Sequence, residues 1–356
     1  MIAQYVHQPA AAPPTADVAM PEEFEPRRLA RRALQVVAVL VVVGLALLLA
    51  PGLGEVRDLL TEARPEWLAL AVAFEAMSCV SYVLMFRPVF CQNMPWRTSW
   101  EIGLSELGAG SIVPASGAGG LALGAWILRE GGMSPQRIAS RSVAFFLIKS
   151  SVNFVAVAVL GTVMALGFVG PELSPWLTVV PAAGAVLVIV AVLAVPWLGV
   201  GVPVPAEAGR TRKAMREVRK ALVGGTREAV QLLRSRNLLV IAGALGYWAW
   251  DNAVLWAAFH AFGYSPPLTI ILMGYLIGQL GGLLPLPGGL GGIDGGLIGT
   301  LIVYGAPAAP TAAAVVVYRV VVFWLPLIVG AIAFISLRRG LNKPDRPELC
   351  VVPAAT

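Results

Sequence analysis

The sequence has few of the residues from which hydrolytic or metal centres are built. It contains two histidines, His7 and His260, so a histidine metal centre or a Ser-His-Asp triad has little support. Cys79, Cys91 and Cys350 form neither a CxxC pair nor an even framework, and we expect free thiols rather than a zinc site or a disulfide scaffold. No GxxxxGK[ST] sequence occurs, which argues against ATP hydrolysis. We therefore expect no enzyme, no metal and no cofactor.

Charged residues are also scarce, at 13% of the 356 positions, whereas 58% are hydrophobic and the mean hydropathy is +0.78. These values lie outside the usual range of soluble domains and indicate a polytopic membrane protein. The net charge of +6 could suggest a nucleic-acid partner. The basic residues, however, gather at the ends of apolar runs, as the positive-inside rule expects. We therefore read the charge as topology and expect no nucleic-acid partner.

Several apolar runs are long enough to cross the hydrocarbon core of a bilayer, which takes about 20 residues. These runs are residues 33–53, 66–86, 138–168, 174–198, 238–262 and 311–337. Residues 1–26, rich in Ala, Pro and Glu, are predicted to be a disordered cytoplasmic tail, and residues 341–356 a second one. A basic cytoplasmic linker is predicted at residues 201–237. Its segment 209–237 alternates Arg and Lys with apolar residues, which predicts either a short amphipathic helix on the inner leaflet or a solvated loop.

Two further apolar stretches, residues 98–130 and 266–304, are each divided by a Gly- and Pro-rich break. Each half is too short to span comfortably, so each stretch is predicted to be a re-entrant helical hairpin. With a cytoplasmic N-terminus, all but four of the 26 Lys and Arg residues then lie on the cytoplasmic side or in cytoplasmic tails. Two full crossings are the alternative.

The chain between residues 27 and 340 is predicted to be one transmembrane domain made of two similar halves. Residues 33–170 and 171–340 both read as span, span, hairpin, span, but they start on opposite sides of the membrane. VPASGAGG in the first half resembles LPLPGGLGG in the second. The predicted fold is therefore an all-α polytopic membrane protein with about six spanning helices and two re-entrant hairpins in an inverted repeat.

The run PLPGGLGGIDGG, residues 285–296, would form the tip of the second hairpin. Its glycines allow a sharp turn, and the half-helix that follows presents free N–H groups to a phosphate or carboxylate. Arg319 is expected to pair with Asp294 or to receive an anionic head group. The candidate head-group residues are Gly288, Gly289, Gly291, Gly292, Asp294, Tyr318 and Arg319. The alternatives are that the glycines only allow close helix packing and that the ion pair only locks the hairpin.

Several further charges fall inside predicted membrane segments, where each costs roughly 2.5–3.5 kcal/mol at a helix centre. Glu75, Ser78 and Tyr82 share one helical face, and Asp251 follows Tyr247 by four residues. A polar cavity would explain these positions together, whereas pairing for structure is the alternative for each. The residues assigned to this cavity or to its charge balance are Glu75, Glu106, Arg141, Lys149 and Asp251.

Residues 285–332 resemble the signature of the flippase-like transmembrane domain of lysylphosphatidylglycerol synthetases and their stand-alone bacterial relatives. That pattern combines P-x-P-G-G-x-G-x-x-E, a Gly-ended half-helix, and a helix carrying Y-R and F-W-L-P. It falls here on Pro285, Pro287, Gly288, Gly289, Gly291, Gly305, Tyr318, Arg319, Phe323, Trp324, Pro326 and Gly330. Asp294 stands where the family usually has glutamate, and the first hairpin lacks the charged G-E-x-x-R pattern of many relatives.

The resemblance implies lipid handling without the synthase reaction, since no aminoacyltransferase domain follows residue 340. We expect a flippase-like protein of the bacterial inner or plasma membrane, with both termini cytoplasmic. Its partners would be membrane lipids with an anionic head group, and it would move a phospholipid, an aminoacyl-phospholipid or a glycolipid carrier. The alternatives are a transporter of a soluble anion, a non-transporting partner of a lipid-modifying enzyme, or an intramembrane transferase with Asp294 as base.

Overall fold

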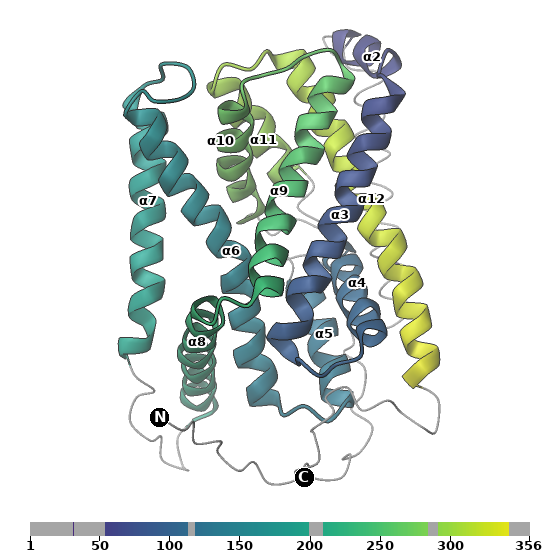
Figure 1. Ribbon diagram of the computed structural model, residues 1–356, viewed down its shortest axis with the longest axis vertical. Helices are drawn as coiled ribbons and strands as arrows, with labels where there is room; N and C mark the ends of the chain where they lie inside the picture. Colours follow the sequence, from purple (N-terminus) through teal and green to yellow (C-terminus); the bar gives the residue numbers. More distant parts are fainter. Residues whose placement is uncertain (1–30, 32–53, 113–117, 199–208, 284–290, 342–356) are drawn as a thin grey trace.

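The computed structural model describes residue 31 and residues 54–112, 118–198, 209–283 and 291–341, and every regular element in these ranges is a helix. Figure 1 shows the helices arranged as a bundle between two ends. In chain order they are α2 (Gly54–Thr61), α3 (Pro65–Phe90), α4 (Trp96–Ile112), α5 (Ala118–Glu130), α6 (Pro135–Ala165), α7 (Pro175–Ala194), the 3-10 helix η2 (Val195–Leu198), α8 (Arg210–Arg234), α9 (Leu238–Ala261), α10 (Leu268–Gly278), the 3-10 helix η3 (Gln279–Leu283), α11 (Gly292–Val303) and α12 (Ala308–Leu341).

Five helices are long and apolar enough to cross a membrane: α3, α6, α7 with η2, α9 and α12. They confirm five predicted spans to within a few residues, and the sixth, residues 33–53, lies outside the described residues. Their starts follow from local sequence. A proline occupies the first turn of α3, α6 and α7, where its missing N–H costs nothing. Asn237 caps α9 by accepting hydrogen bonds from Leu239 N at 3.0 Å and Val240 N at 3.4 Å.

The two divided stretches form helix pairs that return to the end from which they start. In Figure 1, α4 and α5 lie in the lower half of the bundle, whereas α10 and α11 lie in the upper half. The helices have 17, 13, 11 and 12 residues. At about 1.5 Å per residue, none of them reaches the roughly 30 Å of a hydrocarbon core. The arrangement is that of two re-entrant hairpins from opposite ends, while the structural equivalence of the two halves stays a prediction.

The buried apolar side chains form two clusters, one in each half of the bundle. The lower cluster includes Phe86 and Phe145, and the upper cluster includes Leu255 and Leu301. Close helix contacts use small residues, as is usual in lipid, where burial alone gives little net driving force between helices. At the α4–α12 contact, a Cβ added to Gly330 would lie 2.5 Å from Leu104 O. Of the polar residues described below, Tyr82 belongs to the lower cluster, and Tyr275 and Tyr318 belong to the upper one.

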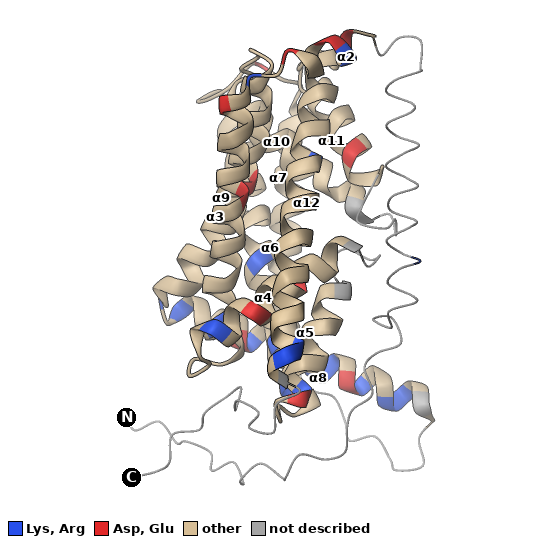
Figure 2. Cartoon of the chain, turned by 90° about the vertical axis from the view of Figure 1, so that its right-hand side faces the viewer, with Lys and Arg blue, Asp and Glu red and all other residues tan. Residues whose placement is uncertain are grey.

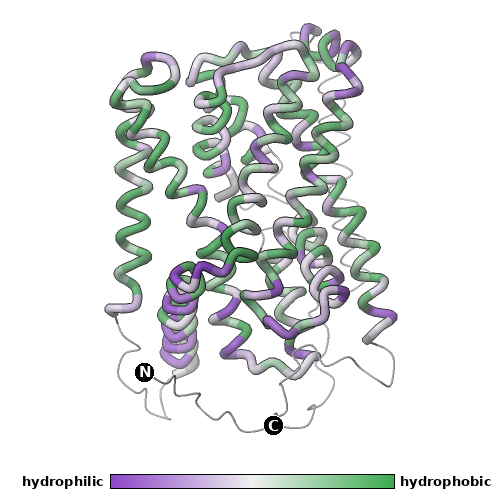
Figure 3. Tube along the Cα trace, viewed as in Figure 1, coloured by the Kyte–Doolittle hydropathy of each residue, from purple (hydrophilic) through white to green (hydrophobic). Residues whose placement is uncertain are grey.

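Helix α8 lies across the lower end of the bundle, and Figure 2 shows Lys and Arg along it and gathered at that end. Figure 3 shows the contrast between the polar α8 and the hydrophobic long helices. Of the two predictions for the basic linker, the amphipathic helix is the one that forms, with 25 residues. Its second half packs closely on α6, since a Cβ added to Gly225 would lie 2.7 Å from Ser140 O.

The cysteines depart in part from expectation. Cys79 is a free and buried thiol in α3, as predicted. Cys91, the residue that ends α3, takes part in a disulfide, so the prediction of a free thiol is wrong there. Spacing along the chain could not show this, because a disulfide depends on which thiols the fold brings together. Cys350 lies outside the described residues.

Candidate functional site

A polar cavity of about 390 Å³ lies inside the bundle. Side chains from four of the long helices, α3, α6, α9 and α12, line it together with residues of both hairpins. The predicted positions that line it are Glu75, Glu106, Lys149, Asp251, Tyr318 and Arg319. Residues that are up to 244 positions apart in the sequence thus face one space. The predicted polar cavity is present, although its contact with a substrate stays a prediction.

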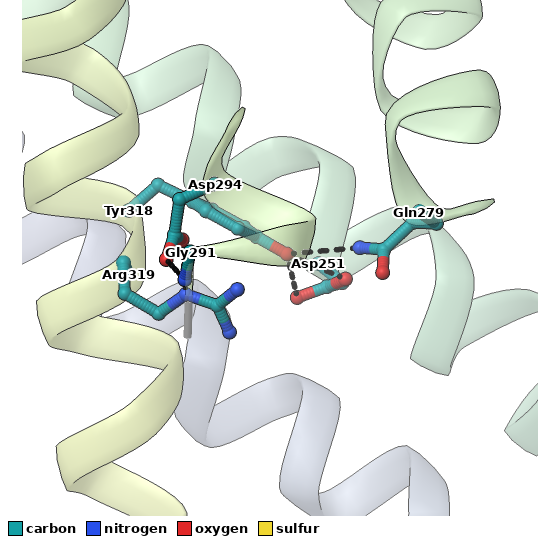
Figure 4. A network of polar contacts seen from close by, with 6 residues as sticks. All are labelled: Asp251, Gln279, Gly291, Asp294, Tyr318 and Arg319. Carbon is teal, nitrogen blue, oxygen red and sulfur yellow. Dashed lines mark hydrogen bonds and ion pairs between the residues drawn. The ribbon is translucent and has the colours of Figure 1, made fainter. Parts of the chain in front are cut away.

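Asp251 is the centre of a hydrogen-bond network that joins α9, α10, η3 and α12. Figure 4 shows the part formed by Asp251, Tyr318 and Gln279. Its carboxylate on α9 accepts hydrogen bonds from Tyr275 Oη on α10 and from Tyr318 Oη on α12, the latter at 3.1 Å to Oδ2. Tyr318 Oη in turn accepts a hydrogen bond from Gln279 Nε2 at 3.5 Å. This network fixes the second hairpin against two long helices, because a buried carboxylate without donors is costly.

Sequence reasoning missed Tyr275 and Gln279, which also line the cavity. Both stand in the otherwise apolar run LTIILMGYLIGQ, four positions apart, so they lie near the same face at the inner end of the hairpin helix. That spacing was the signal that could have identified them. It is the same signal that placed Tyr247 with Asp251.

A second polar group surrounds Glu106 on the first hairpin. Tyr82 Oη donates a hydrogen bond to Glu106 Oε1 at 2.7 Å. The Lys149 ammonium lies 5.8 Å from the centroid of the Tyr82 ring and 5.6 Å from that of Tyr247, within the range of cation–π attraction. Glu106 also fits closely against α5, because a Cβ added to Gly124 would lie 2.5 Å from Glu106 Oε2. A glycine on α5 therefore makes room for this carboxylate.

The ion pair expected between Arg319 and Asp294 is present. Arg319 Nε lies 2.5 Å from Asp294 Oδ1, and the two side chains are 14% and 23% exposed. Asp294 Oδ2 accepts a hydrogen bond from Gly291 N at 2.8 Å and so closes the N-terminus of α11. Gly291 has a φ of 82°, which favours glycine. The pair therefore connects α12 to the start of the half-helix in the second hairpin.

The remaining predicted site residues have different positions. Among the described residues, Gly291, Gly292 and Asp294 do not line the cavity. Gly291 N donates to Asp294, and Asp294 is connected to the cavity only through its ion pair with Arg319. Gly288 and Gly289 lie outside the described residues. Direct contact of the glycine-rich tip with a head group therefore stays a prediction.

Arg141, which was predicted to belong to the cavity, is not among the described residues that line it. Its Nη1 donates a hydrogen bond to Val89 O at 2.9 Å, and its Nε lies 2.9 Å from Glu228 Oε2 on α8. Burial raises the pKa of the Glu228 carboxyl above its usual value, an effect that the Arg141 and Arg137 guanidinium groups oppose. Arg141 lies in the second turn of α6, where it fastens α8 to the bundle instead of facing the cavity.

The charges that line the cavity are unequal in sign. Among the described residues that line it, three carboxyl groups, those of Glu75, Glu106 and Asp251, face two cations, Lys149 and Arg319. Within the described part of the chain, Glu75 Oε2 and Glu106 Oε2 are buried and have no hydrogen-bond partner. Buried oxygens normally find donors, so these two atoms are unusual, and their contact with a bound group stays a prediction.

Comparison with known proteins gives a consistent picture. The model of a family described as the lysylphosphatidylglycerol synthase TM region matches residues 35–330. Two curated relatives from Methanothermobacter thermautotrophicus, both called UPF0104 membrane protein, are 26% identical over 325 residues and 27% identical over 326 residues. These alignments cover 83% and 82% of this chain, and 94% and 89% of the relatives.

Proposed function

Because the chain belongs to the family of the lysylphosphatidylglycerol synthase TM region, we propose that it is a lipid transporter of the flippase type. It moves a phospholipid, an aminoacyl-phospholipid or a glycolipid carrier between the leaflets of the cell membrane. The proposal is supported by a polar cavity inside an apolar bundle, bordered by two hairpins that enter from opposite ends. Broken helices at a membrane midplane are typical of transport sites.

The size of the cavity suits a lipid head group. Ligand sites commonly measure roughly 300–1,000 Å³, so about 390 Å³ accommodates a head group while the acyl chains stay in the bilayer. An ionic head group cannot cross the hydrocarbon core freely, because moving a charge into it is costly. Polar partners along the path would lower this cost, which is the physical basis of the proposed activity.

We assign the type of head group from the excess of carboxyl groups over cations among the described residues that line the cavity. A purely anionic head group, as Arg319 alone suggests, would meet three carboxylates and only two cations. A head group with both a phosphate and an ammonium satisfies both signs. The phosphate would lie near Arg319 and Lys149, and the ammonium would donate to Glu75 or Glu106, whose buried oxygens lack partners among the described residues. An aminoacyl-phospholipid, or a zwitterionic phospholipid whose ammonium carries N–H groups, has this composition.

The distribution of charge gives the proposed orientation. Lys and Arg gather at the lower end of the bundle in Figure 2, around α8 and the ends of α5 and α12. By the positive-inside rule this end faces the cytoplasm. Both termini of the chain are then cytoplasmic, and the protein resides in the plasma membrane.

The test is lipid movement in proteoliposomes. Purified protein is reconstituted with fluorescent lysyl-phosphatidylglycerol, phosphatidylglycerol or phosphatidylcholine. Dithionite, which does not cross the bilayer, is added outside, and the loss of fluorescence from lipid that moves from the inner to the outer leaflet is followed over time. We expect protein-dependent movement that is faster for lysyl-phosphatidylglycerol than for phosphatidylglycerol. Glu75→Gln should remove this preference, whereas the exposed Glu66→Gln, the same substitution outside the cavity, should retain it. Correctly folded protein that moves no lipid would refute the proposal and favour a soluble-anion transporter or a non-transporting partner.

A further inference from the structure

A second and larger cavity lies outside the central one, between α7 with η2 and the amphipathic helix α8. Its volume is about 810 Å³. In Figure 1, α8 lies beside the lower end of α7, and residues of both elements line the groove. Among the residues that the structure describes, none that lines it also lines the central cavity. The groove is therefore a separate feature of the protein, and the transport proposal does not account for it.

One wall of the groove is an apolar face of α7 and η2. Val190, Leu193 and Trp197 contribute to it and are 58%, 51% and 90% exposed. They belong to the stretch Pro175–Trp197, which is apolar enough to cross a membrane. Trp197 stands at its end, the position at which tryptophan is enriched near the membrane interface. Within a bilayer this wall faces acyl chains rather than water.

The other wall is a polar and basic face of α8. Arg227, Gln231 and Arg234 occupy positions i, i+4 and i+7, so all three lie on the face of α8 that points toward α7. Arg227 Nη2 donates a hydrogen bond to Pro196 O at 3.2 Å and so joins α8 to η2. Arg234 is exposed and makes no hydrogen bond or ion pair with another residue that the structure describes. Its guanidinium is thus open to a ligand in the groove.

We propose that this groove binds an anionic phospholipid of the leaflet at the lower end of the bundle. An acyl chain lies along Val190 and Leu193, and the phosphate is held by Arg234 and Arg227. The combination of an apolar wall at membrane depth and guanidinium groups at its edge matches the two parts of such a lipid, because guanidinium forms paired hydrogen bonds with phosphate. A soluble ligand would match only the basic wall.

The position of α8 supports the same assignment. In its first half, Met215 and Val218 are 73% and 57% exposed and form an apolar face on the outside of the helix. Several basic residues flank this face. An amphipathic helix of this kind lies in the membrane interface. The groove behind it then opens at the depth of lipid phosphates, where Arg227 and Arg234 would meet them.

Photo-crosslinking in nanodiscs tests the proposal. The full chain is placed in phosphatidylcholine nanodiscs with a diazirine-labelled phosphatidylglycerol or, separately, a diazirine-labelled phosphatidylcholine, and the crosslinked peptides are mapped by mass spectrometry. We expect the phosphatidylglycerol probe to label Pro175–Trp197 more strongly than the phosphatidylcholine probe does. Each basic residue near a membrane surface contributes about 1 kcal/mol, so Arg234→Gln should lower this labelling about fivefold. Arg212→Gln, which removes the same charge from α8 outside the groove, should leave it unchanged.

A second pair of variants tests the apolar wall without altering charge. Leu193→Trp fills the groove and should reduce labelling, whereas Leu187→Trp, on an exposed part of α7 outside the groove, should not. Glu75→Gln in the central cavity should leave the labelling intact, which separates this site from the transport proposal. Equal labelling by both probes, or labelling unchanged in both Arg234→Gln and Leu193→Trp, would overturn the proposal. The latter result would favour residues 199–208, which join the two walls and lie outside the described residues, as the occupant.

Discussion

Neutralising both members of the Arg319–Asp294 pair separates a structural lock from a head-group contact. Two unit charges about 4 Å apart attract by about 4 kcal/mol at an effective dielectric constant of about 20. The side chains are only 14% and 23% exposed, so water screens the pair weakly. Loss of one partner of a buried pair costs about 3–5 kcal/mol. With this partial exposure, we expect Arg319→Gln and Asp294→Asn each to lower the free energy of unfolding by about 2–3 kcal/mol.

The double variant decides between the two roles. Removing both charges leaves no buried unpaired ion, so the double variant should be more stable than the sum of the single losses predicts, with a coupling energy of about 1–3 kcal/mol. Stability is measured by unfolding in mixed micelles with increasing SDS. Lipid movement is measured in the proteoliposome assay. Because Arg319 lines the cavity, we expect movement to stay lost in the double variant even though stability recovers.

A conservative variant provides the matched control. Asp294→Glu keeps the carboxylate and has the residue that the related family usually carries, so stability and movement should both be retained. Recovery of lipid movement in the double variant would refute our reasoning about Arg319 and leave the pair as a lock alone. Single variants as stable as the native protein would show that the pair contributes nothing measurable.

Three further predictions concern the hairpins and the helix contacts. With the native cysteines replaced by serine, Gln92→Cys and Ser134→Cys, at the two ends of the first hairpin, should react with a membrane-impermeant maleimide from the same side; reaction from opposite sides would show a full crossing. Gly330→Ala would place a Cβ 2.5 Å from Leu104 O and should lower the free energy of unfolding in SDS by about 1–3 kcal/mol. Gly340→Ala, with no atom within 4 Å of its added Cβ, should lower it little. Equal losses in the two variants would contradict the α4–α12 contact. Tyr318→Phe removes the donor 3.1 Å from Asp251 Oδ2 and should cost about 1–3 kcal/mol and slow lipid movement, so native behaviour of this variant would remove Tyr318 from the site.

The spans and hairpins could be predicted because they depend on length and composition. An apolar run either reaches across a hydrocarbon core or does not, and a Gly- and Pro-rich break divides a helix wherever it occurs. The starts of α3 and α9 follow from Pro65 and Asn237 in the same local way. Charges inside apolar runs also identified candidates for the cavity, because each such charge needs a partner.

The partners themselves were predicted less well. The pairing of Arg319 with Asp294 was expected and is present. The hydrogen bond from Tyr82 to Glu106 and the contact of Tyr275 with Asp251 were not identified, because each joins helices whose relative rotation the sequence does not give. Arg141 was assigned to the cavity, yet it faces Glu228 on α8. The position of Arg141 in the second turn of α6 fixes its depth but not the direction in which its side chain points.

Hydropathy and helix-breaking residues act over a few neighbours, so the amino-acid sequence alone was enough to identify an all-helical membrane protein with long spans and two divided stretches. The folded chain was needed to show which charges share a cavity, that the described residues lining it include more carboxyl groups than cations, and that an apolar face of α7 meets two arginines of α8. Those properties depend on how helices rotate and pack against one another, and that is set by contacts between residues far apart in the chain.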